Sequence, residues 1–174
     1  MRIDKLTSKL QSALADAQSL ALGKEHASIE PAHLLMALID QNRGSAFTLL
    51  SQTGFNVGEL RSQLQKVVND LPQLPDNEGE ISVSPSLGKL LNQADKLTQQ
   101  KGDSFISSET ILLIAMGDKG VVGKILNGFG VSSEALENAI VNLRGGANVS
   151  DPAAEDSWQA LARFCIDLTE RAEN

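Results

Sequence analysis

The sequence predicts an all-α protein built from two tandem four-helix repeats. Residues 6–71 and 83–143 carry matching side chains, first at an offset of 77, as in Leu10 and Leu87, and later at an offset of 76. Apolar residues recur at the three- and four-residue spacings of amphipathic helices. Aromatic residues make up only 3% of the chain, so Leu, Ile, Val and Ala must build the core. Because two repeats are too few for an open solenoid, we expect them to close into a globule with pseudo-two-fold symmetry.

Local signals place four helices in the first copy. Asp4 is the expected N-cap of a helix that ends at Gly23. A mostly apolar and therefore buried helix follows at Pro31–Asp40, because proline suits the first helical position, where no N–H partner is needed. A third helix ends at Gly54, and Asn56 opens the fourth in a capping-box pattern.

The second copy repeats this order after a polar connector at 72–83. Ser84 and Pro85 are the expected N-cap and first residue of its first helix. The buried helix of this copy is expected at 108–116 with Ser107 as N-cap, and the last two helices at 121–127 and 134–143.

The organisation predicted for the whole chain is a double-repeat domain over residues 1–145, a flexible linker over 146–157 and one further helix over 158–174. The linker is short, polar and acidic. The last helix is amphipathic but has nothing of its own to pack on, so we expect it to open a further domain, here truncated. A longer natural open reading frame would test this.

Composition narrows the class of partner. The net charge is −7, and 15 scattered basic residues are outnumbered by 22 acidic ones, which argues against nucleic acid. No apolar run approaches the ~18–20 residues that span a bilayer, and no signal-peptide core follows Met1. Cys165 is the only cysteine, so no intrachain disulfide can form. We expect a cytoplasmic protein with no nucleic-acid and no membrane partner.

Residue types that carry catalysis or bind cofactors form no recognisable site. His26 and His33, the only histidines, lack the further ligands that a metal site needs. The segment 118–125 ends in Gly-Lys as a P-loop does, but Asp118 stands where the motif needs glycine and Ile125 where it needs Ser or Thr. We expect no enzyme activity, metal or cofactor in this chain.

Several stretches closely resemble the N-terminal region of the ClpB-type disaggregases in the Clp family of AAA+ chaperones. They are MRIDKLT at 1–7, ALADAQSLA at 13–21, IEP at 29–31, DKL at 95–97, KGD at 101–103, FISSE at 105–109 and IDLTERAE at 166–173. The last stretch is similar to the helix that opens the family's first ATPase module. The resemblance covers essentially the whole chain, with the two repeats, linker and helix in the family's order.

The resemblance implies a much larger parent protein. That parent would be a homohexameric ATPase that uses ATP and magnesium to thread polypeptides out of aggregates, together with the DnaK-type chaperone system, under heat stress. This chain would be its N-terminal domain, monomeric on its own, and would capture unfolded or aggregated polypeptides.

The resemblance also implies site residues. Thr7, Asp103 and Glu109 match polar positions tied to substrate handling, Leu97 matches a position in an apolar substrate-binding patch, and Thr110 stands at another patch position that is usually apolar. From the residues alone, Leu97 is equally compatible with the surface and the core. Glu109 also suits the positive end of a helix dipole.

Two other functions stay open. The same double repeat serves as an adaptor-docking domain in protease-coupled Clp unfoldases, and a ligand-free oligomerisation bundle is a third possibility. The two copies differ at three matched pairs of positions, and any binding surface is expected there: Asp103 against His26, Phe105 against Ser28, and Thr110 against His33.

Overall fold

The computed structural model describes residues 3–41, 44–74, 81–145 and 148–155, and within them the chain forms eight α-helices. The first copy contains α1 (Ser8–Gly23), α2 (Pro31–Asp40), α3 (Ser45–Thr53) and α4 (Val57–Asn69). The second copy contains α5 (Pro85–Gln100), α6 (Ser108–Met116), α7 (Val121–Asn127) and α8 (Ser133–Arg144). A short 3-10 helix, η1 (Ile3–Lys5), precedes α1. The predicted all-α fold of two four-helix repeats is confirmed.

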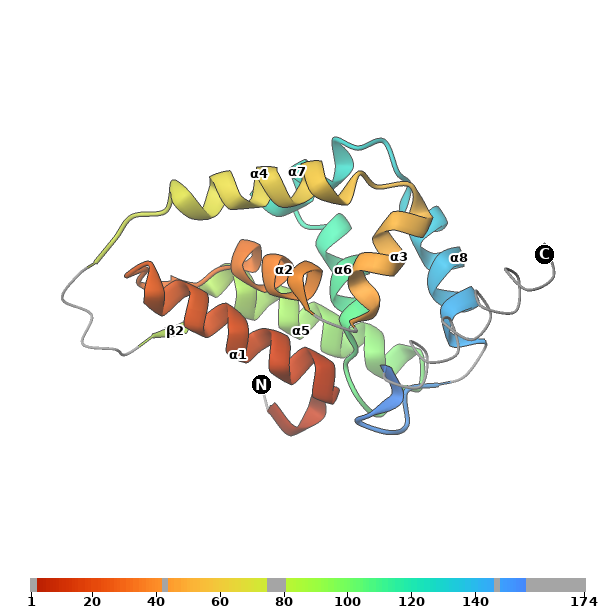
Figure 1. Cartoon of the computed structure of the whole chain (residues 1–174). Helices are drawn as coiled ribbons and strands as arrows, with labels where there is room; N and C mark the ends of the chain where they lie inside the picture. Colours follow the sequence, from red (N-terminus) through yellow and green to blue (C-terminus); the bar gives the residue numbers. More distant parts are fainter. Residues whose placement is uncertain (1–2, 42–43, 75–80, 146–147, 156–174) are drawn as a thin grey trace, which may run out of the picture.

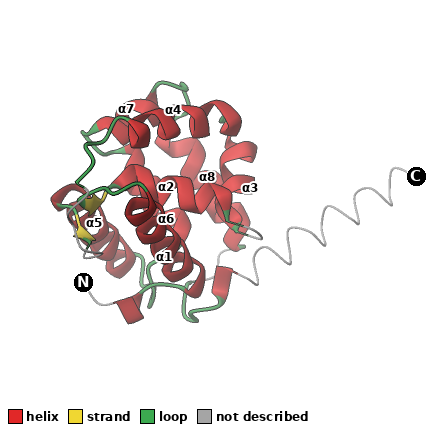
Figure 2. Ribbon diagram, turned by 60° about the vertical axis from the view of Figure 1, so that its left-hand side comes forward, coloured by secondary structure: helices red, strands yellow, loops and turns green. Residues whose placement is uncertain are grey.

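Several helix contacts are preserved when the two copies are exchanged. Within each copy the first helix contacts the second, α1 with α2 and α5 with α6, and the second contacts the fourth, α2 with α4 and α6 with α8. Between the copies, α3 lies against α8 and α4 lies against α7, and exchange of the copies interconverts these two contacts. Figures 1 and 2 show α4 and α7 side by side at one end of the molecule and α2 and α6 inside it.

The second helix of each copy forms the centre of the core. Every residue of α2 is buried except Asp40, and seven of the nine residues of α6 are buried. Mostly Leu, Ile, Val and Ala side chains from both copies join in one continuous apolar cluster. The rings of Phe55 and Phe129 meet between the copies with their centroids 5.7 Å apart.

Most predicted helix ends are confirmed, and one is wrong. Asn56 and Ser84 cap their helices through side-chain oxygens, and Gly54 ends α3 with a positive φ of 114° that favours glycine. The expected N-cap Asp4 instead lies in η1, and Thr7 caps α1 by accepting the Leu10 N–H. The apolar spacing continues through Ile3 and Leu6, so the pattern alone could not show that α1 begins later.

Two short strands were not expected from the sequence. β1 (Ser28–Ile29) pairs in parallel with β2 (Ser82–Val83), and the Ser84 N–H extends the ladder to the Ile29 carbonyl at 3.0 Å. A strand of two residues is too short to show an alternating pattern of apolar side chains. This pairing fixes the end of the connector to the first copy.

Residues 148–155, part of the flexible linker predicted over 146–157, lie against the domain. Val149 and Glu155 are both fully buried, and the Ser8 N–H donates to the Pro152 carbonyl at 2.8 Å. The polar composition gives no sign of this attachment, because two buried residues are enough to hold the segment against the domain. The predicted helix at 158–174 lies outside the described residues. No helix in the described part of the chain is both long and apolar enough to cross a bilayer.

Candidate functional site

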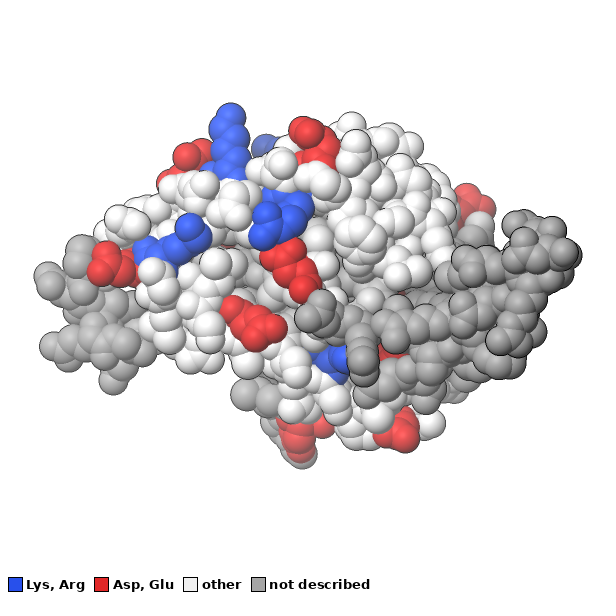
Figure 3. Space-filling view, viewed as in Figure 1, with Lys and Arg blue, Asp and Glu red and all other residues white. Residues whose placement is uncertain are grey.

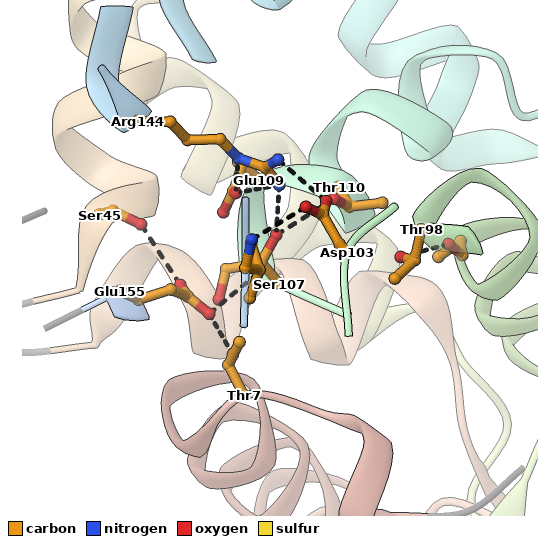
Figure 4. A network of polar contacts seen from close by, with 12 residues as sticks. Thr7, Ser45, Thr98, Asp103, Ser107, Glu109, Thr110, Arg144 and Glu155 are labelled. Carbon is orange, nitrogen blue, oxygen red and sulfur yellow. Dashed lines mark hydrogen bonds and ion pairs between the residues drawn. The ribbon is translucent and has the colours of Figure 1, made fainter. Parts of the chain in front are cut away.

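Three of the predicted site residues belong to one buried polar network between the copies, drawn in Figure 4. Arg144, the last residue of α8, is its centre. Its guanidinium donates to Asp103 Oδ2 at 2.9 Å and to Glu109 Oε1 at 2.7 and 2.9 Å, and it reaches Ser107 Oγ at 3.2 Å. Both carboxylate side chains are only 1% exposed. Burial lowers the pKa of Arg144, but Glu109 and Asp103 together raise it further, so the arginine stays charged.

The same network reaches the end of the described chain through Glu155. Its carboxylate accepts hydrogen bonds from the Thr7 hydroxyl, the Ser108 N–H at 3.1 Å and the Ser45 hydroxyl at 3.4 Å. These donors come from the start of α1, the start of α6 and the start of α3, so one side chain joins both copies. We call Thr7, Asp103, Ser107, Glu109, Arg144 and Glu155 together the polar seam.

Burial and the neighbouring Glu109 carboxylate raise the pKa of Glu155 to about 7, although the hydrogen bonds from Thr7 and Ser108 work in the opposite direction. Glu109 Oε2 is buried and accepts no hydrogen bond among the described residues. The seam therefore holds three buried carboxyl groups against one guanidinium.

The remaining two predicted site residues lie at its edge or away from it. Thr110 is buried at the edge of the seam, and its hydroxyl lies 3.1 Å from Ser107 Oγ. Leu97 is half-buried on α5, between the two alternatives that the sequence left open. Sequence reasoning missed Arg144 and Glu155. Arg144 was hidden because a basic residue in a last helical turn is ordinary, and Glu155 because it is one of many acidic residues.

At the matched place in the first copy the structure has a pair of histidines instead of charges. The Glu30 N–H donates to His33 Nδ1 at 2.8 Å, so the proton of the His33 ring is on Nε2, which lies 2.9 Å from His26 Nδ1. Both rings are buried and neutral. Burial, then His26 and Lys24, lower the pKa of His33 to about 4. The described residues contain no cluster of three or more potential metal ligands around this pair or elsewhere.

An apolar groove lies between α1 and the first half of α5. Its volume is about 490 Å³, which is within the range of ordinary ligand pockets. Val83 at the groove is 40% exposed, Leu14 is half-buried, and Leu91 is buried as expected for a core leucine. The lining residues are Leu6, Leu14, Val83, Ser84, Pro85, Gly88, Leu91 and Asn92. None of the five predicted site residues lines the groove, but Leu6 directly precedes Thr7 of the polar seam.

The charged side chains on the face in Figure 3 do not favour a partner of either charge. Basic and acidic side chains are interspersed there, and Arg61 pairs with Asp40 at 2.7 Å. The described residues on this face form no continuous basic surface for a phosphate backbone. Among the described residues, the apolar groove and the polar seam are two features that can carry a function, beside a smaller pocket lined by His26 and Leu74.

Comparison with known proteins settles the family. The profile of the Clp repeat (R) N-terminal domain matches residues 5–155. The chain belongs to this family. It is 56% identical over 173 residues to the chaperone protein ClpB of Pseudomonas putida and 47% identical to that of Vibrio cholerae. Each alignment covers 99% of this chain and 20% of the relative, so the chain spans about a fifth of the length of these relatives. The resemblance seen in the sequence is confirmed.

Solved Clp N-domains share the fold at low sequence identity. The Hsp104 N-terminal domain from Candida albicans matches with a TM-score of 0.75 and 23% identity, over 87% of this chain and 99% of that one. A complex of a ClpV N-domain with a VipB peptide matches with a TM-score of 0.65 and 23% identity, over 80% and 86%. These likenesses show that the double-repeat fold is shared.

Proposed function

We propose that this Clp N-terminal domain captures exposed apolar segments of unfolded or aggregated polypeptides for an ATP-driven disaggregase. The observation that carries the proposal is the apolar groove between α1 and α5. Unfolded chains differ from folded ones in exposing apolar side chains, and a shallow apolar groove recognises that difference without reading a sequence. The solved ClpV N-domain bound to a VipB peptide supports a peptide-binding use of this fold.

The groove suits transient binding. Val83 and Leu14 offer apolar surface to a passing segment, while Ser84 and Asn92 add polar groups at the same site. A segment that becomes ordered in the groove loses conformational entropy, so the net affinity stays modest and the segment can be passed on. The polar seam has a different part in the proposal, because Thr7, Asp103 and Glu109 are too buried to touch a bound segment.

The activity of the whole protein is part of the same proposal. The ClpB relatives are five times as long as this chain, and the family resemblance implies a cytoplasmic homohexamer that uses ATP and magnesium and cooperates with a DnaK-type system. In that arrangement this domain supplies binding, and the ATPase modules outside this chain supply the pulling force.

A pair of matched valine variants tests the groove. Val83→Ser removes a partly exposed apolar group from the groove, and Val121→Ser removes one of similar exposure from α7. Titration of the isotope-labelled chain with a permanently unfolded, carboxymethylated protein should shift the amides of Leu14, Val83 and Leu91. Val83→Ser should weaken binding by about 1 kcal/mol, roughly fivefold in Kd, with an unchanged melting temperature, while Val121→Ser should bind normally.

Leu97 is tested in the same titration. If it contributes to the capturing patch, Leu97→Ser weakens binding, and a large loss of stability would instead show a core role. Shifts that avoid the groove, or equal effects of the two valine variants, would refute capture there. Binding of a folded adaptor but of no unfolded protein would favour the adaptor-docking function.

A further inference from the structure

The last described segment is attached to the domain at three points. The Val149 N–H donates to Asp103 Oδ1 at 2.9 Å, and the Val149 carbonyl accepts the Ser104 N–H at 2.7 Å. The Pro152 carbonyl accepts the Ser8 N–H at 2.8 Å. Glu155 then enters the polar seam. Figure 4 shows its carboxylate aimed between Thr7 and Ser45.

The attachment is narrow. Between Asn148 and Glu155 only Val149 and Glu155 are buried, and most of the other residues are exposed. Segments with few buried apolar contacts are at the low end of local stability, so they open without unfolding the rest of a protein. The donors to Glu155 belong to helices that are held by the core itself, so the binding site for this carboxylate stays when the segment leaves.

We propose that residues 148–155 form a strap that latches reversibly onto the domain through Glu155, and so set how much free chain joins this domain to whatever follows. When the strap is latched, the chain leaves the domain at the seam between the copies. When it is released, the eight residues 148–155 are added to the connection. Eight residues span at most about 28 Å, which is enough to change which neighbours the domain can reach.

The latch also assigns a structural role to the predicted substrate-handling residues Thr7, Asp103 and Glu109, which is to hold the strap in place. Thr7 holds Glu155 directly, Asp103 holds the Val149 N–H, and Arg144 ties Asp103 and Glu109 together. These are positioning residues for the strap, since all are buried away from the groove.

Protonation is the expected control of the latch. The groups that face Glu155 are the hydroxyls of Thr7 and Ser45 and the Glu109 carboxylate on α6, with Arg144 and Asp103 beyond it. The pKa of Glu155 is about 7 when latched and near its ordinary value of 4.5 when released. The latched form therefore binds the proton more tightly. The latch tightens as the pH falls from 7 towards 4.5, by about tenfold between pH 8 and pH 6.

Amide hydrogen exchange of the 174-residue chain tests the strap. The reporters are the Ser108 and Val149 N–H groups, which bond to Glu155 and Asp103 only while the strap is closed. Corrected for intrinsic rates, their protection should be about tenfold greater at pH 6 than at pH 8. Glu155→Ala should lose that protection locally, and Glu137→Ala, which removes an exposed acid from α8, should not.

Glu155→Gln separates latching from charge. The amide keeps the shape and stays neutral, so both reporters should remain protected with no change between pH 6 and pH 8. The same pH response in Glu155→Gln as in the natural chain would overturn control by Glu155. Unchanged protection at Ser108 and Val149 in Glu155→Ala would overturn the latch. If Glu155→Ala unfolds the whole domain, the proposal is tested by the pH response of Glu155→Gln alone, compared with that of the natural chain.

Discussion

Replacement of His33 by Asn should change the pH dependence of stability in a predictable direction. The Asn Oδ1 can take the place of His33 Nδ1 and accept the Glu30 N–H, but the bond to His26 is lost. At pH 7.5, where both rings are neutral, this lost bond should cost about 1–2 kcal/mol. The chain has only two histidines, so the histidine part of the pH response comes from this pair alone.

The magnitude follows from the burial of the ring. The pKa of His33 is about 4 in the folded protein and 6.5 in the unfolded chain, so the unfolded chain binds more protons between these values. Stability from neutral His33 is therefore complete above pH 6.5 and is lost as the pH falls towards 4. The loss is about 2 kcal/mol by pH 5 and about 3 kcal/mol at pH 4, from 1.36 kcal/mol per pKa unit.

Glu155 acts in the opposite direction in nearly the same window. Its folded pKa of about 7 lies above the unfolded value of 4.5, so its contribution is complete below pH 4.5 and is lost as the pH rises through 7. The two contributions nearly cancel between pH 4.5 and 6.5 in the natural chain. The histidine effect must therefore be measured as a difference between His33→Asn and the natural chain.

Urea unfolding followed by far-ultraviolet circular dichroism at pH 7.5, 6 and 5 measures that difference. The natural chain should be more stable than His33→Asn at pH 7.5, and the two should become equally stable near pH 5. A gap in unfolding free energy that stays constant from pH 7.5 to pH 5 would refute the buried neutral pair.

The remaining predictions concern the polar seam and two helical glycines. Arg144→Met leaves two buried carboxylates without their guanidinium and should lower the unfolding free energy by about 3–5 kcal/mol. A loss below about 1 kcal/mol in urea unfolding would contradict this. In Gly123→Ala the new Cβ would lie 1.8 Å from the Asp118 carbonyl oxygen, so the backbone must shift and thermal melts should show a loss of about 1–3 kcal/mol. Gly88→Ala meets no atom within 4 Å and should gain about 0.5–1 kcal/mol, so similar melts for the two variants would show that helix propensity dominates.

The sequence predicted the features that local chemistry determines. Pro31 and Ser84 mark helix starts because each acts within its own turn, and the bounds of α2, α6 and α7 were predicted correctly. The polar seam could not be predicted, because its contacts join residues far apart in the chain. Thr7 and Glu155 are separated by 148 positions, and nothing in either neighbourhood indicates the other.

The match between the two copies continues beyond the residues that the apolar pattern covers. In both copies the segment that follows the fourth helix is held at the same place. Gln73 and Val149 are 76 positions apart, as are the other matched residues in the second half of each copy. In the first copy the backbone of His26 bridges to Gln73, and the Leu74 N–H donates to the Glu25 carbonyl at 2.7 Å. In the second copy Asp103, the counterpart of His26, holds Val149.

The strap is therefore the second copy's version of the connector, held at the same place by a different side chain. In the first copy the neutral pair His26 and His33 occupies the position where the connector is held, and the chain then continues into β2 and the second copy. In the second copy Arg144 stands where the first has Val68, and a charged network holds the strap. The residues that differ between the two copies thus lie where the chain leaves each copy. The groove lies elsewhere, between α1 and α5, the first helix of each copy. This separates the surface proposed to capture polypeptides from the device proposed to tether the domain, and predicts that variants of Val83 and Glu155 have independent effects.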